Sequence, residues 1–160
     1  MSIQSPPGNR PLARFLSRFD KSATNIKESL LFTTIGQVPW ALTYSNWYHQ
    51  YPQFPLQALN AASLLFEYTL TDRGTWLSSP SSVTNAVNIY KRGDDASSDP
   101  QGLLLNPARL LQGAKAAQKD LASSFMEWAI SDDGGEEVIR TFSKNGQVLY
   151  SPTPKDQRLD

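Results

Sequence analysis

The pattern of hydrophobic and polar positions alternates between short apolar runs and longer amphipathic stretches. Runs with high β-propensity predict strands over residues 13–17, 68–72, 83–91, 103–105 and 147–150. Apolar residues at helical spacing predict helices over residues 22–36, 39–51, 55–66, 76–77, 116–130 and 131–142. Polar runs at 78–82 and 93–102 predict loops. Strands that alternate with helices are typical of an α/β layer fold, so we expect a mixed, mostly parallel sheet flanked by helices.

Residues that begin or end helices, and apolar faces within them, refine this pattern. Ser22 or Thr24 is a good N-cap for the first helix, and Gly36 is a good residue to end it. One face of the third helix is predicted to point inward through Leu56, Leu59, Ala62, Ser63 and Phe66. Aromatic residues mark one face of the second helix, at Trp40, Tyr44, Trp47, Tyr48 and Tyr51. We interpret this aromatic face as core, and the alternative is a protein interface.

Length and composition favour one folded domain. A chain of 160 residues has the usual size of a single domain. Apolar residues make up 39% and charged residues 19%, far from the composition of disordered chains. We therefore expect one lobe over residues 13–152, between a flexible leader at 1–12 and a flexible tail at 153–160.

Charge and cysteine content exclude several kinds of partner. Basic and acidic residues number 15 each, so no net field attracts nucleic acid or an acidic membrane surface. No segment of the sequence is long and apolar enough to span a bilayer. Cysteine is absent, which excludes disulfides, thiolate metal sites and cysteine nucleophiles. We expect a protein without metal or cofactor that binds neither nucleic acid nor membrane.

The segment from Ser17 to Thr24 gathers an arginine, a lysine and three hydroxyl residues at a predicted strand-to-helix turn. The first N–H groups of a helix have no partner within it and carry the positive end of its dipole, so oxyanions bind there. Ser22 and Thr24 add hydroxyl donors, and the planar guanidinium of Arg18 fits two oxygens of a tetrahedral anion. The segment therefore predicts an oxyanion site.

Asp20 lies inside this segment, where a negative charge opposes anion binding. It is compatible with the site if it pairs with Arg18 and fixes the guanidinium, or if it accepts hydrogen bonds from the helix N–H groups. The alternative for the whole segment is structural. Ser22 is then an ordinary N-cap, and Arg18 and Asp20 form a surface ion pair that contributes little.

Four motifs follow one another along the chain: Ser17-Arg18-x-Asp20-x-Ser22-x-Thr24, Tyr68-Thr69-Leu70-Thr71-Asp72-Arg73-Gly74-Thr75, Leu104-Leu105-Asn106-Pro107 and Phe125-x-x-Trp128-x-x-Ser131-Asp132-x-Gly134. In this order they resemble the tungstate- and molybdate-type extracellular solute-binding proteins of ABC transporters, and in particular their fungal relatives with a PBP-like domain. The resemblance covers about residues 15–152, and four ordered motifs are far more specific than one. It implies the periplasmic binding protein-like fold, in which two α/β lobes close on an oxyanion, and not an enzyme.

The resemblance also implies which residues form the site. The anion contacts it implies are the side chains of Ser17, Arg18, Ser22 and Thr24 and the backbone N–H of Ala23. The supporting residues it implies are Asp20, as the partner of Arg18, and Thr71, Asp72 and Arg73, which flank the cleft. Phe19 and Ala23 stand where the bacterial pattern has glycine. We expect Phe19 to crowd the cleft, and Ala23 to lose freedom if its backbone must turn sharply.

The lobe that completes the family's site has no counterpart in residues 1–14, so we expect the second lobe only. Three or four contacts, each worth about 0.3–3 kcal/mol, correspond to micromolar to millimolar affinity at best. Tight binding would then need a partner chain or a homodimer. The resemblance implies an extracellular protein. If Met1 is the native start we expect a cytosolic one, because residues 1–14 lack the apolar core of a signal peptide.

Two other classes of function compete with anion binding. The first is a protein-interaction factor, secreted or host-directed, that keeps the fold without the anion. The second is an enzyme, which the sequence disfavours because His49 is the only histidine and no G-x-S-x-G motif occurs. Asp94, Asp95 and Asp99 lack the spacing and final glutamate of an EF-hand, so they predict a solvated loop rather than a calcium site.

Overall fold

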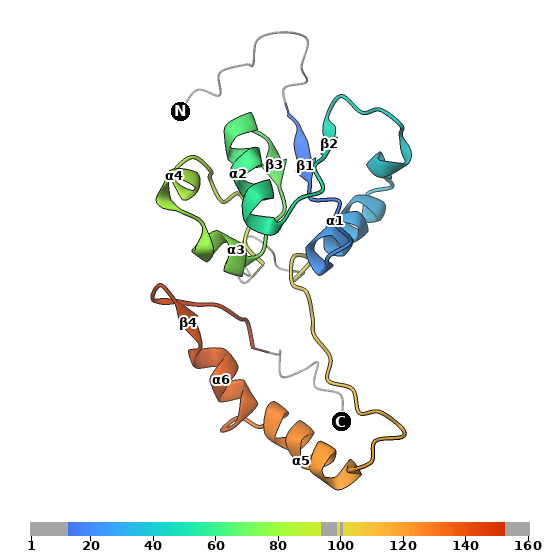
Figure 1. The fold of residues 1–160 in the computed structure, drawn as a ribbon, viewed down its shortest axis with the longest axis vertical. Coiled ribbons are helices and arrows are strands. Elements are labelled where there is room, and N and C mark those ends of the chain that lie inside the picture. Colours follow the sequence, from blue (N-terminus) through green and yellow to red (C-terminus); the bar gives the residue numbers. More distant parts are fainter. Residues whose placement is uncertain (1–12, 94–98, 100, 153–160) are drawn as a thin grey trace. The chain divides into compact units, whose positions relative to one another are not determined.

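The protein is described by a computed structural model over residues 13–93, 99 and 101–152 (Figure 1). The chain divides into two compact units, Met1–Asn106 and Pro107–Asp160. The segments predicted as leader and tail, 1–12 and 153–160, lie outside the described residues. The prediction of one lobe over 13–152 therefore stays a prediction.

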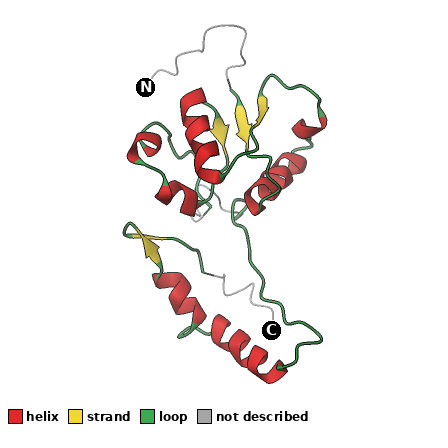
Figure 2. Cartoon of the chain, viewed as in Figure 1, coloured by secondary structure: helices red, strands yellow, loops and turns green. Residues whose placement is uncertain are grey.

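The first unit is built on a three-stranded parallel sheet. Strand β1 (Phe15–Ser17) lies in the centre, with β2 (Tyr48–Gln50) on one side and β3 (Tyr68–Thr69) on the other. The strands alternate along the chain with helices, which flank the sheet (Figure 2). The α/β fold class with a parallel sheet is therefore confirmed. The strands predicted at 13–17 and 68–72 are present but shorter.

Helices of this unit fill the intervals between and after the strands. They are α1 (Ala23–Thr34), the 3-10 turn η1 (Pro39–Ala41), α2 (Pro55–Leu65), α3 (Arg73–Ser78) and α4 (Ser81–Thr84). The helices predicted at 22–36, 55–66 and 76–77 are confirmed. The loop predicted at 78–82 is wrong in part, because α3 extends into it and α4 begins within it.

Successive residues of β1 point to opposite faces of the sheet, and each face meets a different helix. On one face the ring of Phe15 packs edge-on against Phe32 of α1, with centroids 5.2 Å apart. On the other face Leu16 is fully buried in a small core with Ala58 and Ala62 of α2. The sheet is therefore covered by α1 on one side and by α2 on the other.

The inward side of α2 differs in part from the prediction. Its buried residues are Ala58, Leu59, Ala62 and Ser63. Leu56 and Phe66, also predicted to point inward, are exposed. Phe66 is the C-cap and has a left-handed backbone, φ 57°, so its side chain leaves the helical face.

The helix predicted over residues 39–51 is wrong. Only Pro39–Ala41 is helical, and the chain then enters β2. The Ser45 hydroxyl accepts hydrogen bonds from the N–H groups of Trp47 and Tyr48, which forms a local turn before the strand. The carbonyl of Trp47 accepts a hydrogen bond from the first residue of β1. Pairing with the sheet therefore overrides the helical spacing of this segment.

The aromatic face predicted for that helix consequently does not form. Tyr48 is 4% exposed, and its ring lies against Phe15 and Phe32. Tyr44, predicted on the same face, is 82% exposed. The interpretation as core holds for Tyr48 and fails for Tyr44.

Two further predicted strands are wrong. In the segment 83–91, Val83 is buried in α4 and the last residues have no regular secondary structure. In the segment 103–105, the N–H groups of Leu103 and Leu104 donate to the buried carboxylate of Asp99, so they cannot join a ladder. Of the loop predicted at 93–102, residues 94–98 and 100 lie outside the described part of the chain. Asp94 and Asp95 are therefore among the residues that the structure does not describe.

In its described residues, 107–152, the second unit contains two helices and a hairpin. They are α5 (Lys119–Ile130), α6 (Gly135–Thr141), β4 (Ser143–Lys144) and β5 (Gln147–Val148), the two strands being antiparallel. The predicted helices and the last strand are confirmed with shorter bounds. Asn145 and Gly146 have φ angles of 53° and 74°, which fits the two-residue turn of a hairpin.

The junction between α5 and α6 depends on glycine. Gly134, and neither Ser131 nor Asp132 as predicted, is the N-cap of α6, and Ser131 instead ends α5. A Cβ on Gly134 would collide with the Trp128 carbonyl, and one on Gly135 with the Ala129 carbonyl. Any larger residue would therefore force the two helices apart.

Candidate oxyanion-binding site

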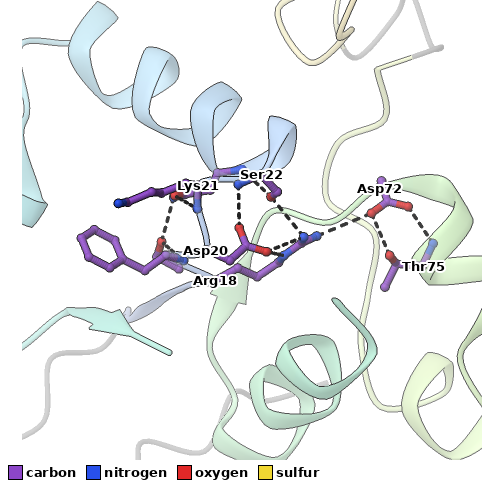
Figure 3. A network of polar contacts seen from close by, with 9 residues as sticks. Arg18, Asp20, Lys21, Ser22, Asp72 and Thr75 are labelled. Carbon is purple, nitrogen blue, oxygen red and sulfur yellow. Dashed lines mark hydrogen bonds and ion pairs between the residues drawn. The ribbon is translucent and has the colours of Figure 1, made fainter. Parts of the chain in front are cut away.

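The predicted anion segment lies at the carboxyl end of β1, the central strand, and leads into α1. The turn between β3 and α3 lies beside it, at the end of a neighbouring parallel strand. In open parallel sheets, ligands bind outside the carboxyl ends of the strands. Figure 3 shows that side chains from these two turns meet around the guanidinium of Arg18.

Arg18 is the buried centre of the site, with its side chain 7% exposed. Its Nε and Nη2 both donate to Oδ2 of Asp20, at 3.1 and 2.7 Å, and Nη2 also donates to the Ser22 hydroxyl at 3.1 Å (Figure 3). The implied pairing of Arg18 with Asp20 is therefore present. Arg18 is buried and Asp20 is exposed, so the pair is partly buried and differs from a fully exposed surface ion pair.

The Nη1 atom of Arg18 has no hydrogen-bond acceptor in the described part of the chain, although it is inaccessible to solvent. The oxygen that approaches it is Oδ2 of Asp72, at 3.6 Å, which is an ion pair without a hydrogen bond. A buried donor without an acceptor costs about 1–3 kcal/mol. Nη1 is therefore the part of the guanidinium whose hydrogen-bonding capacity the described residues leave unused.

Asp20 holds the turn from its other oxygen as well. Oδ1 accepts the backbone N–H of Ser22 at 3.0 Å. Burial by itself would raise the pKa of Asp20, but the hydrogen bonds from Ser22 and Arg18 outweigh it and lower the pKa below the usual value. Asp20 therefore orients Arg18, and the hydrogen bonds from Arg18 and Ser22 compensate the negative charge of the Asp20 carboxylate.

Ser22 caps α1, and Thr24 does not. The Ser22 hydroxyl accepts the N–H of Asn25 at 3.4 Å while it accepts from Arg18. The N–H groups of Ala23 and Thr24, at the start of α1, have no acceptor within the helix. The capping role and the implied site thus use the same residue, and the helix start faces the side on which Arg18 lies.

Ser17 lies in the interior, fully buried. Its hydroxyl accepts hydrogen bonds from the Phe19 N–H at 3.2 Å and from Nδ2 of Asn25 at 3.3 Å. Oδ1 of Asn25 accepts the N–H of Lys21 at 3.1 Å. Sequence reasoning missed Asn25, whose side-chain amide contacts both Ser17 and Lys21 and so holds both ends of the turn. Its place three residues after the N-cap is the signal that could have identified it.

The backbone explains the two departures from the family's glycine pattern differently. Phe19 and Lys21 have φ angles of 45° and 60°, in the left-handed region that glycine enters most easily. Glycine at position 19 would therefore relieve strain, and Phe19 is partly exposed beside the turn. Ala23 is the first residue of α1 with no positive φ, so the sharp turn expected there is absent.

The turn after β3 places its three predicted residues unequally. Asp72 caps α3 and accepts the N–H and the hydroxyl of Thr75, both at 2.7 Å. The Thr71 hydroxyl is buried without a hydrogen-bond partner in the described part of the chain. Arg73 begins α3. Asp72 approaches Arg18 to 3.6 Å, and Thr75, which holds Asp72, was not among the predicted site residues.

His49 belongs to a separate cluster. It lies on β2, not on a helix as predicted, and its Nδ1 is 2.9 Å from the buried carboxylate of Glu67. Arg14 pairs with the same carboxylate at 3.0 Å. Across the described residues, no group of three or more His, Cys, Asp or Glu could hold a metal ion. Within the same residues, no helix has the length and hydrophobicity to cross a membrane.

A parallel α/β unit with a buried arginine and a helix start at the end of its central strand is typical of a lobe of a solute-binding protein. No protein-family model matches the sequence. The chain is 29% identical over 144 residues to a Haloferax volcanii protein proposed as an ABC transporter anion-binding protein, covering 88% of this chain and 40% of that one. It is 30% identical over 120 residues to the tungstate-binding protein TupA of Campylobacter jejuni, covering 74% and 42%. The chain thus spans less than half the length of these curated relatives.

Solved structures extend the comparison. The chain is similar to a periplasmic protein proposed to bind metal, with 56% identity and a TM-score of 0.79, covering 90% of this chain and 68% of that one. It is also similar to the tungstate-binding protein TupA of Desulfovibrio alaskensis, with 25% identity and a TM-score of 0.56, covering 88% and 55%. The chain therefore belongs to the periplasmic binding protein family. Its relatives are solute-binding proteins, in agreement with the prediction that it is not an enzyme.

Proposed function

We propose that the chain binds a small tetrahedral oxyanion at the turn between β1 and α1. The contacts in this proposal are the side chains of Ser17, Arg18, Ser22 and Thr24 and the N–H of Ala23. Asp20 is the partner of Arg18, and Thr71, Asp72 and Arg73 flank the cleft. The observation that carries it is the buried Nη1 of Arg18, which has no acceptor among the described residues and lies in a guanidinium bonded to the N-cap of α1. The names of relatives, one anion-binding and two tungstate-binding, support the same ligand class.

The expected affinity of this chain alone is modest. One arginine, one helix start and three hydroxyls each contribute about 0.3–3 kcal/mol, which we expect to give micromolar to millimolar dissociation constants. We therefore propose that this chain contributes the second lobe of a two-lobed site. The first lobe would come from further sequence of the kind its relatives contain, from a partner chain or from a second copy. That the chain is extracellular, and that it is a fungal-type relative of the transport proteins, both stay predictions.

Isothermal titration calorimetry tests the proposal with tungstate, molybdate, sulfate and phosphate. Wild-type protein should release or absorb heat with at least one of them. Arg18→Ala should weaken that binding at least tenfold, because a charge-assisted hydrogen bond is worth about 1.5–3 kcal/mol. Arg18→Lys should restore only part of it, since an ammonium lacks the planar fork.

Arg109→Ala is the matched control, because Arg109 is an exposed arginine of the second unit. It should leave the titration unchanged. No heat with any of the four anions, or the same heat in wild type and Arg18→Ala, contradicts the proposal. Melting curves give a second readout, since a ligand at a hundred times its Kd stabilises the folded state by about 2.7 kcal/mol.

A further inference from the structure

Two carboxylates flank the guanidinium of Arg18, and they do so in different ways. Asp20 accepts hydrogen bonds from Nε and Nη2 and thereby sets the plane of the group. Asp72 lies 3.6 Å from Nη1 and accepts no hydrogen bond from it. Arg18 is therefore positioned by Asp20, and Asp72 contributes charge without contributing geometry.

Asp72 is held in place independently of Arg18. Its two oxygens accept the N–H and the hydroxyl of Thr75, at 2.7 Å each, as the cap of α3 (Figure 3). Its side chain is 49% exposed, so it faces the open side of the turn. The negative charge at this point would persist whether or not Arg18 contacts a ligand.

A ligand oxygen that bonds to Nη1 would come close to this carboxylate. The ligand oxygen and Oδ2 of Asp72 would both lie near Nη1, and so within a few ångströms of each other, because Oδ2 already lies 3.6 Å from Nη1. The repulsion between them grows in proportion to the charge of the ligand. The attraction of Arg18 and of the start of α1 for the ligand grows with its charge as well, so the contribution of Asp72 is measured by changing Asp72 alone.

We propose that Asp72 is a specificity-determining residue that disfavours tetrahedral dianions relative to monoanions of the same shape. This inference rests on the proposed oxyanion site. It assigns Asp72 a direct electrostatic effect on the ligand, opposite in sign to the effect of Asp20. The two aspartates thus share a charge and a partner, and differ in what their removal does.

Calorimetry with tungstate, a tetrahedral dianion, and perrhenate, a tetrahedral monoanion, tests this on the full chain. Asp72→Asn removes the charge and keeps a good N-cap for α3, so the fold should be preserved. Tungstate affinity should rise about tenfold and perrhenate affinity about threefold, because the repulsion removed is twice as large for the dianion. Asp72→Ser, which also caps helices, should change the two affinities in the same order.

Asp20→Asn is the matched control, with the same change of charge next to the same arginine. It should weaken both anions, since Arg18 loses the acceptor that orients it. If wild type binds tungstate and neither Asp72 variant gains more affinity for tungstate than for perrhenate, the inference is wrong and the proposed function stands. If wild type and the Asp72 variants bind neither these two anions nor molybdate, sulfate or phosphate, the proposed function is wrong and this inference falls with it.

Discussion

Tyr48 on β2 donates a 2.7 Å hydrogen bond to the carboxylate of Glu28 on α1, and both residues are buried. The two lie 20 positions apart in sequence, so the bond ties the helix of the anion site to an edge strand of the sheet. Burial raises the pKa of the Glu28 carboxyl, although the Tyr48 hydroxyl opposes the shift. Burial likewise raises the pKa of Tyr48.

Replacing Glu28 with glutamine should change how stability depends on pH. The folded-state pKa of Glu28 lies above 4.5, so the native protein holds this proton more tightly than the unfolded chain. The free energy of unfolding of wild type should therefore fall as the pH rises through the interval between the two pKa values. Glu28→Gln does not titrate at this position, so the variant should gain stability relative to wild type as the pH rises above the unfolded-chain pKa of 4.5. Urea denaturation at each pH measures the difference, and a difference independent of pH contradicts it.

Tyr48→Phe should destabilise the first unit by about 1–3 kcal/mol, because it leaves a buried carboxylate oxygen without its donor. The same change in a Glu28→Gln background should cost less, since a neutral amide is cheaper to leave unpaired. Urea denaturation of the four proteins gives the coupling energy of the pair. Additive effects of the two changes would show that the 2.7 Å bond contributes nothing of its own.

Ser22→Ala should reduce stability by about 1 kcal/mol through loss of the N-cap of α1. It should also weaken anion binding, because the Ser22 hydroxyl is one of the contacts that hold Arg18. Ser22→Thr keeps the hydroxyl and should recover most of both effects. Thermal melting and calorimetry separate the two readouts. Loss of stability with unchanged anion affinity would assign Ser22 to capping alone.

Leu16→Ala should be the most damaging of the changes considered, at about 2–5 kcal/mol, because it opens a cavity beneath fully buried residues. Leu16 is the only large hydrophobic residue in the small core with Ala58 and Ala62, as far as the described residues show. Leu64→Ala on α2 is the control, since Leu64 is 68% exposed, and should cost much less. Similar losses for the two variants, measured by denaturation, would contradict this account of the core.

Sequence patterns predicted the helices that carry strong local signals. Ser22 begins α1 and Pro55 occupies the first turn of α2, each as its residue type predicts. Patterns failed where a distant partner decides the conformation. Tyr48 lies in a strand because its segment pairs with β1. Leu103 and Leu104 lie in a turn because the Asp99 carboxylate accepts hydrogen bonds from their N–H groups.

The sequence by itself determined the α/β class, the order of the four motifs and the donors gathered between Ser17 and Thr24. These depend on residue types at short spacing, which a linear pattern records. Only the tertiary structure decided that Arg18 is buried, that its Nη1 finds no acceptor within the described part of the chain, and that Asp72 lies 3.6 Å from this atom. The physical reason is that these two residues follow different strands, β1 and β3, and meet only because those strands pair side by side.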